Sequence, residues 1–199
     1  MGFFPVFTDL AGRKVLICGS GSAALEKIRK LQPFGPDITV ISREIPKKAE
    51  ETEYLHWIRR GFEPGDLAGR PAFVIAAENR EENSRICSLC RKAGIPVNAA
   101  DQPEECDFYF PALVQAGDLT VGISTAGKAP AAAAALRQEL EEQLPDDTEE
   151  IISWLEALRQ QVRRKTEDSG LRRSFLRKAA QAAFAKGRPL DVEELRKLK

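Results

Sequence analysis

The 199-residue chain has little of what a metal site or a disulfide framework needs, with four cysteines, one histidine and one methionine. The single histidine, His56, has no cysteine, serine or carboxylate partner at a readable spacing, so we assign it no chemistry. Cys87 and Cys90 share a C-x-x-C spacing, which fits either half of a zinc site or two buried helical thiols. Because the sequence has no second such pair, we predict no metal site.

The chain also lacks an excess of charge and a long apolar run. Thirty basic residues balance thirty acidic ones, which argues against nonspecific binding of nucleic acid or membranes as its main activity. The apolar opening is short and has no basic leader, and no run reaches the roughly 18 apolar residues of a membrane helix. We therefore expect a cytoplasmic globular protein with no nucleic-acid or membrane partner.

The strongest local signal is KVLICGSGSAALEKIRK, residues 14–30, an apolar run that meets a glycine-rich turn and continues as a helix. Gly19 permits a tight turn, Gly21 lets the backbone approach a pyrophosphate, and the free N–H groups of the following helix stabilise the anion. A second apolar run, residues 38–41, completes a βαβ unit. This context predicts a dinucleotide-binding turn.

The end of the second strand leaves the type of dinucleotide open. A carboxylate there commonly holds the ribose hydroxyls of NAD, and Glu44 stands near that position. Arg43 could equally meet the 2′-phosphate of NADP, and both residues could instead belong to a solvated loop.

The remaining pattern predicts an α/β protein in three parts. We expect a Rossmann-type parallel sheet domain over residues 1–106, a small α+β dimerisation region over residues 107–144 and a helical C-terminal domain over residues 145–199. The middle part is a strand pair followed by an alanine-rich helix. Within the first part we expect helices over residues 46–60 and 80–93, and strands at residues 73–77 and 94–101.

Two charged features allow more than one role. Asp101 follows the last strand of the predicted sheet, where it could either reach a substrate or simply open a turn. Eight basic residues against two acidic ones occur between Arg159 and Lys178, a face that is either solvated or able to steer an anionic ligand.

Three segments carry a family resemblance beyond the glycine turn: Asn98-Ala99-Ala100-Asp101, Cys106-Asp107-Phe108-Tyr109-Phe110-Pro111-Ala112 and Ser124-Thr125-Ala126-Gly127-Lys128-Ala129-Pro130. Together they resemble the precorrin-2 dehydrogenase and sirohydrochlorin ferrochelatase family, the N-terminal module of siroheme synthase. Because no methyltransferase domain follows, the chain resembles the stand-alone form.

The resemblance implies NAD-dependent oxidation of precorrin-2 to sirohydrochlorin by a homodimer, with Fe²⁺ as a further substrate if the chain is also a ferrochelatase. It implies that Asp101 is the general base and that Ser124 lies beside the substrate pocket, where Lys128 and Arg137 could bind substrate carboxylates. The candidate cofactor-binding residues are Gly19, Gly21, Ser22, Ala23, Arg43, Glu44, Ala76 and Asn98. Glu78 stands where relatives often have threonine.

Two other functions stay open. One is a chelatase that inserts metal without dehydrogenation, which turnover of NAD would exclude. The other is a regulatory protein that senses NAD without catalysis, which binding of a tetrapyrrole would exclude.

Overall fold

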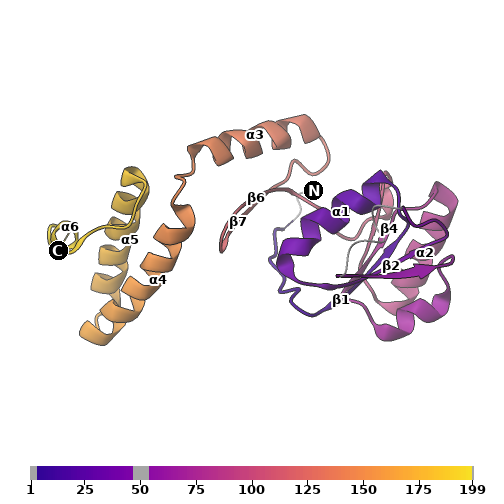
Figure 1. The fold of residues 1–199 in the computed structure, drawn as a ribbon, viewed down its shortest axis with the longest axis horizontal. Coiled ribbons are helices and arrows are strands. Elements are labelled where there is room, and N and C mark those ends of the chain that lie inside the picture. The colour runs from indigo at the N-terminus through magenta and orange to yellow at the C-terminus, as the bar shows by residue number, and fades with distance from the viewer. Residues whose placement is uncertain (1–3, 47–53, 199) are drawn as a thin grey trace. The chain divides into compact units, whose positions relative to one another are not determined.

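The computed structural model describes residues 4–46 and 54–198. The chain divides into two compact units, Met1–Phe110 and Pro111–Lys199 (Figure 1). Among the described residues, no helix combines the length and apolar character needed to cross a bilayer. The predicted further boundary between residues 144 and 145 stays a prediction.

The first unit is built on a five-stranded parallel sheet with the order β3-β2-β1-β4-β5. Its strands are β1 (Lys14–Cys18), β2 (Asp37–Ser42), β3 (Leu55–Arg59), β4 (Phe73–Ala76) and β5 (Val97–Ala99). The described helices between these strands are α1 (Ser22–Leu31), α2 (Arg80–Ala93), and the 3-10 helices η1 (Gln32–Phe34) and η3 (Pro64–Gly69). A further 3-10 helix, η4 (Pro103–Glu105), follows β5. This is the predicted Rossmann-type arrangement, with β1 at the centre.

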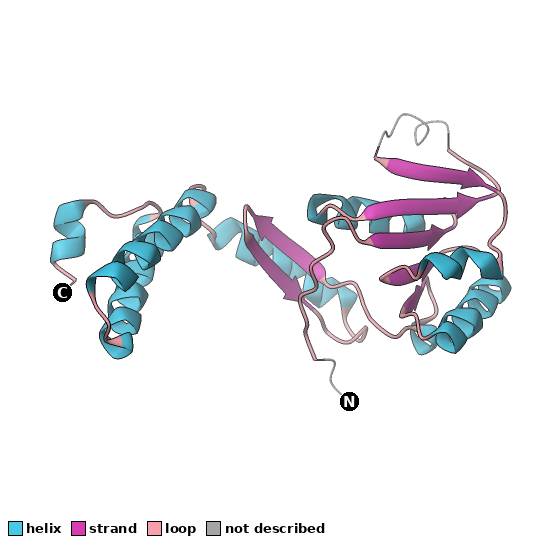
Figure 2. Cartoon of the chain, turned by 90° about the horizontal axis from the view of Figure 1, so that it is seen from below, coloured by secondary structure: helices cyan, strands magenta, loops and turns pink. Residues whose placement is uncertain are grey.

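Alternating side chains of the central strands build two separate cores, one on each face of the sheet. Figure 2 shows the strands of this sheet and the helices beside it. Val15 and Ile17 of β1 pack in the core that α1 covers, to which the helix contributes Ile28. Leu16 and Cys18 pack in the opposite core, which α2 covers. Burial on both faces explains why β1 is apolar throughout after Lys14.

The prediction of a helix over residues 46–60 is wrong for its second half. Residues 55–59 form β3, which pairs in parallel with β2 and places Trp57 opposite Val40. Residues 47–53 lie outside the described part of the chain. His56 is largely exposed on this outermost strand, with its Nε2 atom 3.3 Å from Asp37 Oδ1.

The second unit contains the predicted strand pair and the helices that come after it. Strands β6 (Ala112–Ala116) and β7 (Leu119–Ile123) are antiparallel, and α3 (Pro130–Gln143) is the alanine-rich helix. The tail contains α4 (Thr148–Lys165), α5 (Ser169–Lys186) and α6 (Val192–Arg196). Its core is centred on Ile151, Ala183 and Leu190.

Glu194 connects α6 to the end of α5 through charged hydrogen bonds. Its carboxylate accepts hydrogen bonds from Lys186, Arg188 and the Asp191 backbone N–H, and Asp191 in turn caps the helix. Hydrogen bonds from these donors, Arg188 first, lower the pKa of Glu194 to about 2.

Because the folded-state pKa is depressed, this attachment is complete above the ordinary glutamate pKa of about 4.3 and is lost as pH falls towards 2. We expect the protection of the α6 amides against hydrogen exchange, measured relative to the intrinsic exchange rate at each pH, to fall across that interval. In Glu194→Gln this protection should already be lower at pH 7 and should change much less with acid. Equal exchange profiles for the two proteins would contradict this role.

Candidate active site

The turn after β1 is held against the end of β4 by an unusually close backbone approach. Gly19 has φ +113°, and its N–H donates to the Ile41 carbonyl over 2.8 Å. A Cβ atom at this position would lie 2.3 Å from the Ala77 carbonyl oxygen, which makes any residue other than glycine sterically incompatible. Gly19 therefore brings the ends of β1, β2 and β4 together.

Gly21, the second glycine of the turn, borders open space. Gly21 precedes α1 at the N-cap position with φ −70°, and a Cβ atom there would meet nothing within 4 Å. The first turn of α1, which includes Ser22 and Ala23, carries no acidic side chain, and Gly21 offers no side-chain cap. This helix start therefore fits the pyrophosphate of a dinucleotide, because its N–H groups and positive dipole end face open space.

Two serines that the sequence analysis did not single out connect the glycine turn to the end of β2. Ser42, which is 4% exposed, donates through Oγ to Ser20 Oγ over 3.0 Å. Ser20 Oγ in turn donates to the Glu44 carbonyl over 2.6 Å, and the Glu44 N–H donates to Ser42 Oγ. The network fixes the backbone of Glu44, and the sequence signal for it is a hydroxyl residue at the end of each of two neighbouring strands.

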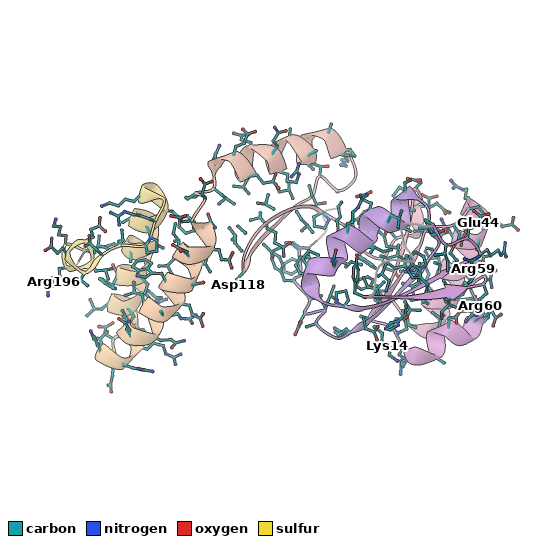
Figure 3. The ribbon with its side chains drawn as sticks, viewed as in Figure 1. Lys14, Glu44, Arg59, Arg60, Asp118 and Arg196 are labelled. Carbon is teal, nitrogen blue, oxygen red and sulfur yellow. The ribbon has the colours of Figure 1, made fainter. Side chains whose placement is uncertain are left out.

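Charged side chains follow the neighbouring strands at this edge of the sheet. Glu44 follows β2 at the same edge of the sheet as Arg59, which is the last residue of β3 (Figure 3). Burial raises the pKa of Glu78, which follows β4; the positive charge of Arg43 opposes this shift, whereas Glu82 and Glu44 add to it. Arg43 is thus close enough to Glu78 to interact with it electrostatically.

The loop that carries Glu78 is itself firmly held. The Asn83 side chain, which is 1% exposed, accepts from the Glu78 N–H and donates to the Glu78 carbonyl. Asn79 caps α2 by accepting from the Glu82 N–H over 3.0 Å. The buried Ala76 ends β4 immediately before this loop.

Asp101 is a candidate residue other than glycine that adopts a positive φ. It is exposed, lies two residues beyond β5 and has φ +57°, in the left-handed region that aspartate tolerates better than most residues. The adjacent Ala100 N–H donates to the Ala76 carbonyl over 2.8 Å, so the turn continues from the edge that also holds Gly19. A polar residue in strained backbone at this edge is typical of a functional site.

The Asn98 side chain makes hydrogen bonds within the protein that the sequence did not predict. Its side chain is 6% exposed, and Nδ2 donates to the Phe108 carbonyl over 2.8 Å and to Cys106 Sγ over 3.4 Å. Asn98 thus fastens the 106–108 segment to β5. Its predicted contact with a cofactor stays a prediction.

The predicted substrate-binding residues all belong to the second unit. Ser124 is exposed and accepts from the Ala126 N–H, and Lys128 closes a tight turn by donating its N–H to the Thr125 carbonyl. Arg137 on α3 pairs with Glu141, one helical turn later. Because these residues and Asp101 lie in different units, their assembly into one site stays a prediction.

The second unit separates its charges along the chain. The basic residues counted between Arg159 and Lys178 are exposed at the end of α4 and on α5, except Arg172, whose guanidinium donates to the Thr166 and Glu167 carbonyls. At the start of α4 an open hollow of about 510 Å³ is lined by Asp146, Asp147, Glu149, Glu150, Ser153 and Pro189. The acidic hollow is unsuited to a polycarboxylate ligand, whereas the basic surface would attract one.

The cysteine positions favour buried thiols over a zinc site. Cys87 and Cys90 are both fully buried on α2, and burial raises their pKa values to about 11 and about 12. Among residues 4–46 and 54–198, no group of three or more histidine, cysteine or acidic side chains is placed to hold a metal.

We expect the two glycines of the turn to respond differently to substitution by alanine. Gly19→Ala should lower the free energy of unfolding by roughly 2–4 kcal/mol, because the new methyl group meets the Ala77 carbonyl in backbone of positive φ. Gly21→Ala should leave stability within about 1 kcal/mol and weaken dinucleotide binding, because its methyl group enters the open space.

Urea unfolding and calorimetric titration with NAD would measure the two effects. Equal destabilisation by both substitutions would contradict the distinction between a packed and an open glycine.

Comparison with known proteins accounts for both units. A family model described as putative NAD(P)-binding matches residues 6–112, and one described as sirohaem biosynthesis protein central matches residues 116–143. Among solved structures, one described as SirC, precorrin-2 dehydrogenase, is similar with a TM-score of 0.72 and 21% identity, covering 98% of this chain and 96% of that one. This likeness confirms the predicted fold.

Curated relatives point to the same group. The chain is 33% identical over 178 residues to the siroheme synthase of Thioalkalivibrio sulfidiphilus (strain HL-EbGR7), covering 88% of this chain and 36% of that protein. It is 38% identical over 147 residues to siroheme synthase 2 of Aeromonas salmonicida (strain A449), covering 73% of this chain and 30% of that protein. The chain thus spans about a third of the length of these relatives. It belongs to the family that the two models describe together, a putative NAD(P)-binding domain followed by the central segment of sirohaem biosynthesis proteins, as its sequence motifs predicted.

Proposed function

We propose that the chain oxidises precorrin-2 to sirohydrochlorin, with NAD as the hydride acceptor. The observation that carries this proposal is Asp101, an exposed carboxylate in left-handed backbone at the edge of the sheet that also presents the dinucleotide turn. The likeness to a precorrin-2 dehydrogenase structure and to siroheme synthases supports the choice of substrate.

The reaction removes a hydride and a proton from the substrate, giving sirohydrochlorin, NADH and H⁺. When bound, the nicotinamide of NAD would accept the hydride. Asp101 accepts the proton through its carboxylate, while the start of α1 beyond Gly21 holds the pyrophosphate. Glu44, whose backbone is fixed by the serine network at the end of β2, would hold the ribose hydroxyls.

The second unit supplies the contacts to substrate in this proposal. Precorrin-2 carries eight carboxylates, which Lys128, Arg137 and the exposed cations of α4 and α5 would attract. Ser124 would hydrogen-bond the macrocycle or its side chains. A cytoplasmic location, with no membrane or nucleic-acid partner, stays part of the proposal.

Iron insertion is a secondary proposal, with Fe²⁺ as a substrate. Its support is the name siroheme synthase, which belongs to relatives that are much longer than this chain. An assay of metal entry into sirohydrochlorin separates it from dehydrogenation.

The key test is Asp101→Ala, assayed by anaerobic NADH absorbance with precorrin-2 and NAD. We expect kcat to fall by roughly 10²–10⁴-fold, because the proton acceptor is removed, while calorimetric affinity for NAD is retained. Glu193→Ala, which removes an exposed carboxylate of α6 outside the proposed site and interface, is the control and should keep native turnover. Undiminished turnover in Asp101→Ala would contradict its role, and metal insertion without any NADH from the native protein would favour the chelatase.

We also propose a homodimer formed through residues 107–143. The support is an apolar surface on α3, where Leu136 is 51% exposed beside four exposed alanines, Ala131, Ala132, Ala134 and Ala135.

Leu136→Glu should shift sedimentation from dimer to monomer at micromolar concentration, because a carboxylate would be buried in the interface. Leu171→Glu on α5, where the leucine is 64% exposed outside the proposed interface, should remain dimeric. A native protein that sediments as a monomer would overturn the dimer.

A further inference from the structure

The turn that presents Asp101 needs support that β5 alone does not give. β5 is only three residues long, Val97–Ala99, and Asp101 adopts φ +57° two residues later. A non-glycine residue in this region costs about 1 kcal/mol or more, so surrounding contacts must select the conformation.

The Cys106 thiol lies across this turn. Its Sγ accepts from the Ala99 N–H at 3.2 Å and lies 3.3 Å from the Ala99 carbonyl oxygen. It also lies 3.4 Å from the Gln102 carbonyl oxygen. One sulfur atom therefore contacts the backbone on both sides of Asp101.

The residues after Cys106 fix the sulfur in place. The Asp107 N–H donates to the Val97 carbonyl over 2.8 Å, and Asp107 Oδ2 accepts from the Val97 N–H over 2.9 Å. Together with the amide of Asn98 on the Phe108 carbonyl, these bonds pair residues 106–108 with β5. Residues 106–108 are thus hydrogen-bonded along β5, the last strand of the sheet.

The far side of the turn is anchored as well. The Gln102 side chain, 3% exposed, donates through Nε2 to Ser84 Oγ on α2 over 3.1 Å. Burial raises the pKa of the Cys106 thiol, so that it remains protonated and able to donate to a carbonyl at neutral pH. Asp101 is therefore exposed, whereas Ala99 and Gln102 on either side of it are held by hydrogen bonds.

We propose that Cys106 is a positioning residue, whose thiol ties Ala99 to Gln102 and thereby aims the Asp101 carboxylate at the substrate. The proposal rests on the proposed function, because the proton that Asp101 accepts comes from the dehydrogenation. Displacing a reacting group by about 1 Å can cost 10²-fold in rate, so a clamp on this backbone is sufficient to affect turnover.

Three variants of the 199-residue chain test the role of the Cys106 thiol. Cys106→Ala removes every sulfur contact, Cys106→Ser keeps a shorter donor and acceptor, and Cys90→Ala removes a fully buried thiol that makes none of these contacts. For each protein, amide hydrogen exchange of residues 99–102 and the kcat and KM for NAD would be measured.

We expect Cys106→Ala to lower kcat by roughly 10-fold to 100-fold, to leave KM for NAD unchanged and to accelerate exchange at residues 99–102. Cys106→Ser should recover part of both effects, and Cys90→Ala should show neither, even where it lowers thermal stability. Native exchange and native kcat in Cys106→Ala would overturn the proposal, as would an equal kcat loss in Cys90→Ala. If the native protein produces no NADH, the proposed function fails, and faster exchange in Cys106→Ala alone then decides whether the clamp exists.

Discussion

The contact between Gly19 and the Ala77 carbonyl is the constraint on which the proposed site depends. It brings the end of β1 against the end of β4, the two strands between which the order of the sheet reverses direction. Because a methyl group cannot fit there, only glycine can occupy this position. Two residues later, Gly21 borders open space and α1 begins without a side-chain cap, at the same edge of the sheet.

The β5 edge of the sheet is organised by different means. β5 has only three residues, so regular strand pairing cannot define the turn after it. The 106–108 segment supplies the missing bonds through a thiol, a carboxylate and the amide of Asn98. A motif that looks like a loop in the sequence is thus part of the sheet edge in three dimensions, where its side chains take the place of backbone partners.

The sequence was sufficient for the elements whose pattern is local. The apolar runs of β1 and β4, and the helix over residues 80–93, are explained directly by burial on both faces or by helical spacing. It was not sufficient for β3, because Leu55–Arg59 lies at the sheet edge, is only partly buried and contains two charged or titratable side chains. Bonds that join distant residues, such as Ser42 to Ser20, leave no periodic signal at all.

The candidate residues therefore differ in how they could be found. Gly19 and Gly21 were identified correctly as turn residues, but only the structure separates the packed glycine from the open one. Asn98 was predicted to bind a cofactor, which stays a prediction; the structure adds that its amide donates to the Phe108 carbonyl, a bond that its place in a strand does not signal. The same reasoning applies to Cys106: it is only five residues from Asp101, but no sequence pattern indicates that its sulfur contacts the backbone on both sides of Asp101. A residue that makes four contacts to the backbone and side chains around an exposed carboxylate is better understood as support for that carboxylate than as a buried thiol among others.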